Sequence, residues 1–179
     1  CIISGWAFGS DDIAEDFDVR IEVGRRRHRV GDTVALALEC TIPGRYHLYG
    51  NPLGPGIGKP LRLHVAGADN IRWIEARKTS AKRFQPDVGR WVWAYEDRAT
   101  FFLIGILQSG EKRRIRGTIT IDALLCHISC IPVRKHIEFS IGVGRNRIAY
   151  PFANRIALRS RYVSAEKMPT QQESLELAR

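Results

Sequence analysis

The fold is decided by a stretch in which every second residue is apolar or small: Ile115-Arg116-Gly117-Thr118-Ile119-Thr120-Ile121-Asp122-Ala123-Leu124-Leu125. A period of two places alternate side chains on opposite faces of an extended chain, as in a half-buried β-strand. Turn-forming residues precede the stretch at Ser109-Gly110, and another strand-like run follows at 136–141. The stretch is therefore predicted to be one strand of a sheet.

Short runs of strand character also occur upstream of this stretch. They are predicted at 17–23, 33–40, 46–49, 61–65 and 100–104. Turn signals such as Gly31-Asp32 separate them, with a spacing of roughly 8–12 residues between turns. Seven or more short strands predict an all-β sandwich or barrel. Because helices and strands do not alternate, a thioredoxin-like fold is not expected.

The length of 179 residues suits one globular domain with short extensions. We expect the domain at 11–144, a signal-peptide remnant or N-terminal extension at 1–10, and a basic, partly helical tail or linker at 145–179. Ala7-x-Gly9 is typical of a signal cleavage site and predicts export. A lipid on Cys1 and an arbitrary chain boundary are the alternatives. No apolar run is long enough to span a membrane.

Basic residues dominate the charge: 28 Lys and Arg against 19 Asp and Glu give a net charge of +9. They cluster in two runs, at 25–29 and 112–116. Both runs are expected to be solvated hairpin tips and not one continuous face. No aromatic residues interleave with the arginines as on a base-stacking platform, so nucleic acid is not an expected partner.

The segment Cys126-His127-Ile128-Ser129-Cys130-Ile131-Pro132 carries the candidate chemistry. A disulfide here closes a small loop and adds little chain entropy, which favours redox chemistry or metal binding over stapling. Disulfide exchange requires an accessible thiolate and a second thiol that resolves the mixed disulfide. His127, Arg134 and Lys135 are cations that could lower a cysteine pKa. An inert disulfide or two buried thiols remain the alternatives.

Metal binding is a further alternative for the same segment. Cys126, His127 and Cys130 offer soft ligands, with His47 and His136 as additions. Only one cysteine pair is present, so a structural zinc site is not expected, whereas Cu(I) needs fewer ligands. No cofactor is expected. Cys40 is predicted to be a small buried apolar residue.

Aromatic residues form two further groups. Tyr46, His47 and Tyr49 could lie near the cysteine loop, while Trp91, Trp93 and Tyr95 alternate along one face of an extended segment. Ordinary core packing is the default for all of them. The functional alternative is an aromatic shield over the sulfurs.

Several segments together resemble a known family. They are Tyr46-His47-Leu48-Tyr49-x-Asn51-Pro52, Gly58-Lys59-Pro60-Leu61, Trp73, Tyr95-Glu96 and Leu125-Cys126-x3-Cys130-Ile131-Pro132. In this order, over about residues 17–143, they are similar to the periplasmic N-terminal domain of the DsbD family of thiol:disulfide interchange proteins. The cysteine segment is the most specific element. The cysteine spacing is shorter than in some members, no transmembrane region follows residue 143, and the basic tail has no match.

The resemblance implies an immunoglobulin-like β-sandwich in the periplasm. Cys126 and Cys130 take the place of the redox pair, Tyr46 and Tyr49 match aromatic positions close to it, and Trp91 or Trp93 would be the shield, with Tyr95 and His127 lining the site. Such a domain passes electrons from a membrane-embedded donor to thioredoxin-fold periplasmic proteins. The alternative is a non-catalytic sandwich, an interaction or copper-handling module with a structural disulfide.

Overall fold

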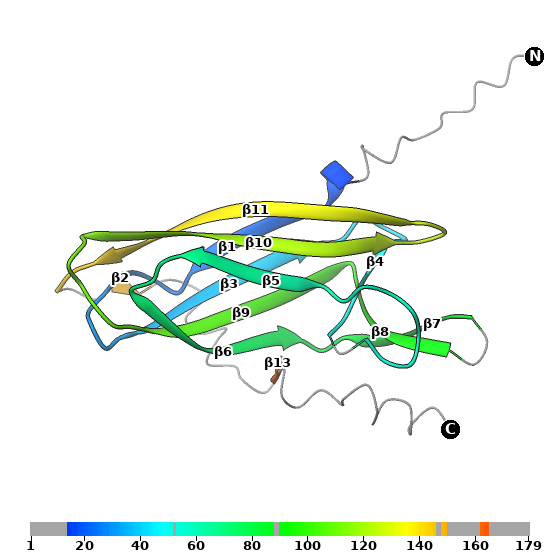
Figure 1. Ribbon diagram of the computed structural model, residues 1–179, viewed down its shortest axis with the longest axis horizontal. Helices are drawn as coiled ribbons and strands as arrows, with labels where there is room; N and C mark the ends of the chain where they lie inside the picture. The colour runs from blue at the N-terminus through cyan, green and yellow to red at the C-terminus, as the bar shows by residue number, and fades with distance from the viewer. Residues whose placement is uncertain (1–13, 52, 88–89, 146–147, 150–161, 165–179) are drawn as a thin grey trace, which may run out of the picture.

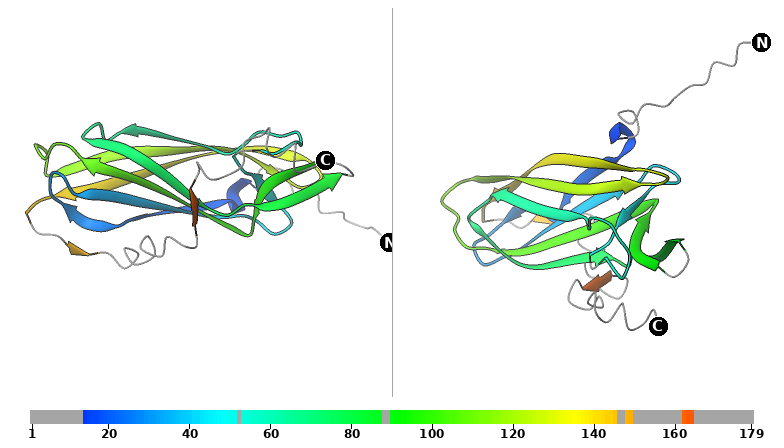
Figure 2. Two further views of the ribbon diagram at one scale, coloured as in Figure 1. Left: turned by 90° about the horizontal axis from the view of Figure 1, so that it is seen from below. Right: turned by 45° about the vertical axis from the view of Figure 1, so that its right-hand side comes forward.

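Two β-sheets packed face to face make up the protein (Figures 1 and 2). The computed structural model describes residues 14–51, 53–87, 90–145, 148–149 and 162–164. The first sheet contains, in spatial order, β1 (Asp18–Val23), β3 (Thr33–Thr41), β9 (Arg98–Leu107), β6 (Ile71–Thr79) and β13 (Tyr162–Ser164). The second contains β12 (Ile148–Ala149), β2 (Arg25–His28), β11 (Cys130–Val143), β10 (Arg114–Cys126), β4 (His47–Tyr49), β8 (Arg90–Glu96) and β7 (Lys82–Asp87), with β5 (Arg62–Gly67) also paired to β10.

The strand order is that of an immunoglobulin-like sandwich. The order β1-β3-β9-β6 corresponds to strands A-B-E-D of that fold, and β11-β10 with β4 and β5 corresponds to G-F-C. The hairpin of β7 and β8 is an addition to this fold, and it lies in the chain between β6 and β9, the strands that correspond to D and E. The predicted all-β, immunoglobulin-like sandwich is therefore confirmed.

Strand β10 has the predicted alternation. Ile115, Ile119, Ile121 and Leu125 are buried in the main core between the sheets. The intervening residues face away from the core, on the outer face of the second sheet. β10 pairs with β11 along its whole length, from Arg114 opposite Gly142 to Cys126 opposite Cys130. This long hairpin places the two cysteines at one end of the sandwich.

A loop interrupts the strand beside β10. β4 pairs with Leu125 and Cys126, and β5 continues along the same edge of β10 from Asp122 to Gly117. Between them residues 50–51 and 53–61 leave the sheet and fold over β8, where the Gly50 amide donates to the Trp93 carbonyl at 2.6 Å. The loop therefore covers the outer face of the second sheet close to the cysteines.

The first arginine run differs from its prediction as a hairpin tip. Arg25–His28 is strand β2, which runs parallel to the end of β11 with Arg27 opposite Gly142. Gly142 permits this approach, because a Cβ there would lie 2.6 Å from the Arg26 carbonyl oxygen. The expectation of a hairpin tip holds for Lys112 and Arg113, which lie in the turn before β10, but the two runs are not separate, since residues of both line one groove.

The predicted extensions are described only in part. In the range 145–179, β12 pairs with β2 and β13 pairs with β6. The predicted signal-peptide remnant at 1–10 and the predicted helical segment from residue 166 lie outside the described residues. Within the described part of the chain, no helix has the length and apolar character needed to cross a membrane.

Candidate functional site

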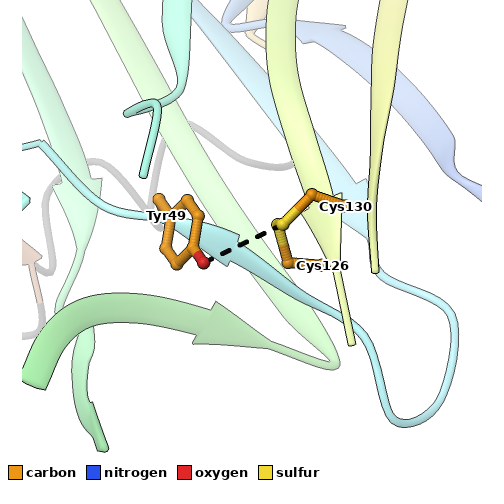
Figure 3. Close-up of a disulfide and its surroundings, with 3 residues drawn as sticks. All are labelled: Tyr49, Cys126 and Cys130. Carbon is orange, nitrogen blue, oxygen red and sulfur yellow. Dashed lines mark hydrogen bonds between the residues drawn. A yellow bond between two sulfur atoms is a disulfide. The ribbon is translucent and has the colours of Figure 1, made fainter. Parts of the chain in front are cut away.

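The β10–β11 turn holds a disulfide between its two strand ends. Cys126 is the last residue of β10, Cys130 is the first of β11, and the two are direct cross-strand partners. Their sulfurs are bonded and their Cα atoms lie 4.1 Å apart (Figure 3). The turn is closed by the His127 amide, which donates to the Ser129 carbonyl at 3.0 Å. The site is thus a disulfide at the tip of a hairpin.

The two cysteines differ in their exposure. Cys126 is 1% exposed and packs with Tyr49, Val92 and Ala94 in a small apolar cluster separate from the main core. Cys130 is exposed, as are the three turn residues before it. An incoming group therefore has access to the residue at position 130, while its bonding partner is covered.

Tyr49 is the aromatic residue in contact with the disulfide. Its hydroxyl oxygen lies 4.0 Å from Cys130 Sγ (Figure 3). Burial raises the pKa of the Tyr49 hydroxyl, so the group is protonated at neutral pH. Because a disulfide sulfur carries no proton, the hydroxyl is the donor in this weak contact. The same donor would face a thiolate after reduction.

The loop over the site holds the Tyr49 ring in place. A Cβ at Gly58 would lie 2.4 Å from the nearest ring carbon of Tyr49, a distance that real Cβ contacts do not reach. Only glycine permits this approach between loop and ring. Leu53 of the same loop packs against the cluster that contains Cys126.

We expect Gly58→Ala to expose the disulfide. The added methyl group must displace either the Tyr49 ring or the loop, and both cover the sulfurs. Reduction by dithiothreitol should become severalfold faster, measured by alkylation of the released thiols over time. Gly44→Ala is the matched control, because a Cβ at Gly44 has no neighbouring atom within 4 Å. Equal rates in the two variants, with the fold intact by circular dichroism, would show that the Tyr49 ring gives no protection.

His47 lies beside the disulfide on β4, directly opposite Cys126. Its ring centroid is 5.2 Å from that of Tyr49 and 4.1 Å from that of Phe84. Burial lowers the pKa of His47; Glu96 opposes this effect and His127 adds to it. His47 is therefore a neutral, packed imidazole at neutral pH, and its role at the site is to support the Tyr49 ring.

The predicted cations lie in different surroundings. The ring of His127, in the turn, packs edge-on against Tyr46 with centroids 5.7 Å apart. Arg134 Nε donates to Asp122 Oδ1 at 2.6 Å, and this contact lowers the pKa of the Asp122 carboxyl. The structure thus brings Tyr49 to the disulfide and Tyr46 to His127 in the turn, while the Arg134 side chain is paired across the hairpin.

Trp93 and Tyr95 of β8 face the main core and not the cluster that contains Cys126. Val92 and Ala94 pack with Cys126, whereas Trp93 and Tyr95 pack against the main core. Trp91 meets Trp93 edge-on at 5.2 Å and lies under the guanidinium of Arg83. A shield at Trp91 or Trp93 stays a prediction; the ring whose contact with the sulfurs the structure gives is that of Tyr49.

Sequence reasoning missed three features of the site. Nothing in the sequence indicates that Gly58 contacts the Tyr49 ring, and the alternation along β8 draws attention to its tryptophans rather than to Val92 and Ala94. The third is Ile128, at the tip of the turn, whose side chain is 94% exposed. A single exposed apolar residue is ordinary on a protein surface, so it is the position of Ile128 beside Cys130 that makes it notable.

The metal alternative has no ligand cluster in the structure. Within the described ranges, no group of three or more His, Cys, Asp or Glu side chains is placed to hold an ion. Cys40 is a free, buried cysteine on β3, and burial raises the pKa of its thiol to about 12. Such a thiol stays protonated and away from solvent.

Fold and site together define an immunoglobulin-like sandwich with a half-exposed disulfide at a hairpin tip. Among solved structures, the chain is similar to the reduced DsbD N-terminal domain of Neisseria meningitidis, with 14% identity, a TM-score of 0.47, and coverage of 79% of this chain and 98% of that one. It is also similar to AvmM, described as catalysing macrocyclization in alchivemycin A biosynthesis, with 11% identity, a TM-score of 0.42, and coverage of 73% and 89%. No known family profile and no curated protein sequence matches the chain. Both TM-scores are below 0.5, so neither likeness supports a conclusion about activity.

Proposed function

We propose that this chain is a thiol-disulfide exchange domain that passes electrons through Cys126 and Cys130 to or from partner proteins. The observation that carries the proposal is the unequal exposure of the two cysteines: the residue at 130 is open to solvent and its partner at 126 is 1% exposed. Exchange needs one sulfur that a partner can reach and a second that stays close by to resolve the mixed disulfide.

The steps follow from this difference in access. In the reduced domain, the Cys130 thiolate attacks a partner disulfide, forms a mixed disulfide and releases one partner thiolate. The Cys126 thiolate then attacks Cys130 Sγ, which closes the Cys126–Cys130 bond and releases the second partner thiolate. Two electrons pass to the partner, and the domain is oxidised. The reverse sequence reduces the domain again.

The partners that fit are other proteins with accessible cysteine pairs. The exposed Ile128 beside Cys130 offers an apolar contact to a partner that approaches the hairpin tip. A persistent disulfide is typical of oxidising compartments such as the bacterial periplasm. With the family resemblance of the sequence, this supports thioredoxin-fold periplasmic proteins as acceptors and a membrane-embedded protein as the donor.

A redox titration tests the proposal. The protein is equilibrated in buffers of defined dithiothreitol ratio, its free thiols are tagged, and the fraction of tagged Cys126 and Cys130 is measured by mass spectrometry. We expect half-reduction at a potential more positive than about −300 mV, because structural disulfides typically lie below that value. A pair that stays oxidised at more negative potentials would instead indicate the non-catalytic sandwich with a structural disulfide.

A further inference from the structure

The two arginine runs meet in one groove at the end of the sandwich opposite the disulfide. β2 supplies three arginines, the bend before β10 supplies a fourth and the first residue of β10 a fifth, and together they line a groove of about 770 Å³. Its arginines are Arg25, Arg26, Arg27, Arg113 and Arg114. None of the described residues that line it is acidic. In Figure 1, β2 lies at one end of the molecule and the β10–β11 turn at the other.

The fold forces these charges together. β2 follows the end of β11 closely because Gly142 has no side chain, and the Val143 amide donates to the Arg113 carbonyl at 2.9 Å. The second run is therefore held directly beside the first, although the two are far apart in the sequence.

We propose that this groove is a binding site for phosphate groups. Guanidinium groups present planar forks of donors that match phosphate oxygens in pairs, and five arginines line this groove. No aromatic residue lines the groove, so nothing is offered for base stacking as in nucleic-acid binding. Ser140, on its floor, adds a hydroxyl donor. The ligand is a compact phosphate-bearing anion, which could be a lipid headgroup or a soluble polyphosphate.

The groove and the disulfide lie far from each other, at opposite ends of the sandwich. At about 3.3 Å per residue, the length of β10 separates them by roughly 40 Å. A phosphate-bearing surface held at the groove would leave the hairpin tip with Cys130 free to meet a partner. The site is thus independent of the disulfide chemistry, and its test needs no redox measurement.

Binding is measured by titrating the full chain with inorganic tripolyphosphate in a calorimeter at 0.1 M salt. The variant Arg27→Gln/Arg114→Gln removes one arginine from each run. Arg62→Gln/Arg90→Gln is the matched control, because it removes the same charge from exposed positions that do not line the groove. We expect at least a tenfold weaker affinity in the groove variant and less than a twofold change in the control.

A second arm identifies the source of the phosphate. Co-sedimentation with phosphatidylglycerol vesicles, against phosphatidylcholine vesicles, measures headgroup binding with the same variants. Groove-dependent binding to vesicles alone assigns a lipid headgroup, and groove-dependent binding to tripolyphosphate assigns a soluble anion. Equal losses in both double variants would mean a net-charge effect and overturn the proposal. The absence of binding in both arms would also overturn it. A titration with polyglutamate in place of tripolyphosphate is the control for a general anion, and equally tight groove-dependent binding of polyglutamate would overturn the proposal as well.

Discussion

With Cys126 replaced by serine, Cys130 is expected to form a mixed disulfide that cannot be resolved and therefore accumulates. The reciprocal variant, Cys130→Ser, should form at least tenfold less of it in the same time. The reason is access: Cys126 is 1% exposed and enclosed by Tyr49, Val92 and Ala94, while Cys130 lies at the surface. Both variants should lose catalytic exchange completely, because neither can close the intramolecular bond.

The measurement uses an aromatic disulfide reagent that releases a coloured thiolate. Both variants are made in a background with Cys1→Ser and Cys40→Ala, so that the reacting position is the only thiol. Release of the thiolate gives the attack rate, and mass spectrometry gives the adduct. Equal rates for the two variants would contradict the assignment of Cys130 as the attacking residue, and a failure of both to react would contradict exchange itself.

The sequence predicted those features of the site that depend on local pattern. Period-two alternation located β10, and the cysteines at its end indicated a hairpin tip. Pro132, at the end of the cysteine segment, is the third residue of β11 and pairs with Leu124 of β10, so it does not interrupt this ladder. Each of these inferences needs only the alternation of side chains and the chemistry of single residues.

The cover of the disulfide could not be predicted in the same way. Tyr49 reaches Cys130 while the described loop residues 50–51 and 53–61 leave the sheet and return, and Gly58 lets that loop pack closely against the ring. The contact between Tyr49 and Cys130 joins residues 81 positions apart in the sequence. The alternation of Trp91 and Trp93 marks one face of β8, yet nothing in that pattern says which face meets Cys126.

The arginine groove likewise could not be predicted from the sequence, because its charged residues come from segments that are distant in the chain. A run of arginines next to glycine favours a turn when it is considered alone. Its pairing with the end of β11 depends on Gly142, more than a hundred residues downstream, and only the folded sheet brings the two runs into one groove. The composition of each run therefore predicts a basic surface. Only the pairing of β2 with β11 brings the two runs together in one groove.

Ile119→Ala is expected to destabilise the sandwich by about 2–5 kcal/mol. Ile119 is fully buried at the middle of β10, between Val65 of β5 and Ile137 of β11, and its side chain belongs to the main core. Truncation leaves a cavity that packed strands on both sides cannot fill. Ile119→Val, which removes a single methylene, should lower the free energy of unfolding by only about 0.5–1.5 kcal/mol.

Opening the disulfide should have a smaller effect than Ile119→Ala. In the chain-entropy account, a bond that closes a loop of so few residues contributes about 2 kcal/mol, against about 4.7 kcal/mol for a loop of 100 residues. Urea unfolding of the oxidised protein, the reduced protein and the two Ile119 variants places all four on one scale. An exchange domain must stay folded through its cycle, and here the buried face of β10 holds the hairpin whether or not the sulfurs are joined. If reduction lowered the stability as much as Ile119→Ala does, the disulfide would be a staple of the fold, and repeated opening during exchange would unfold the domain.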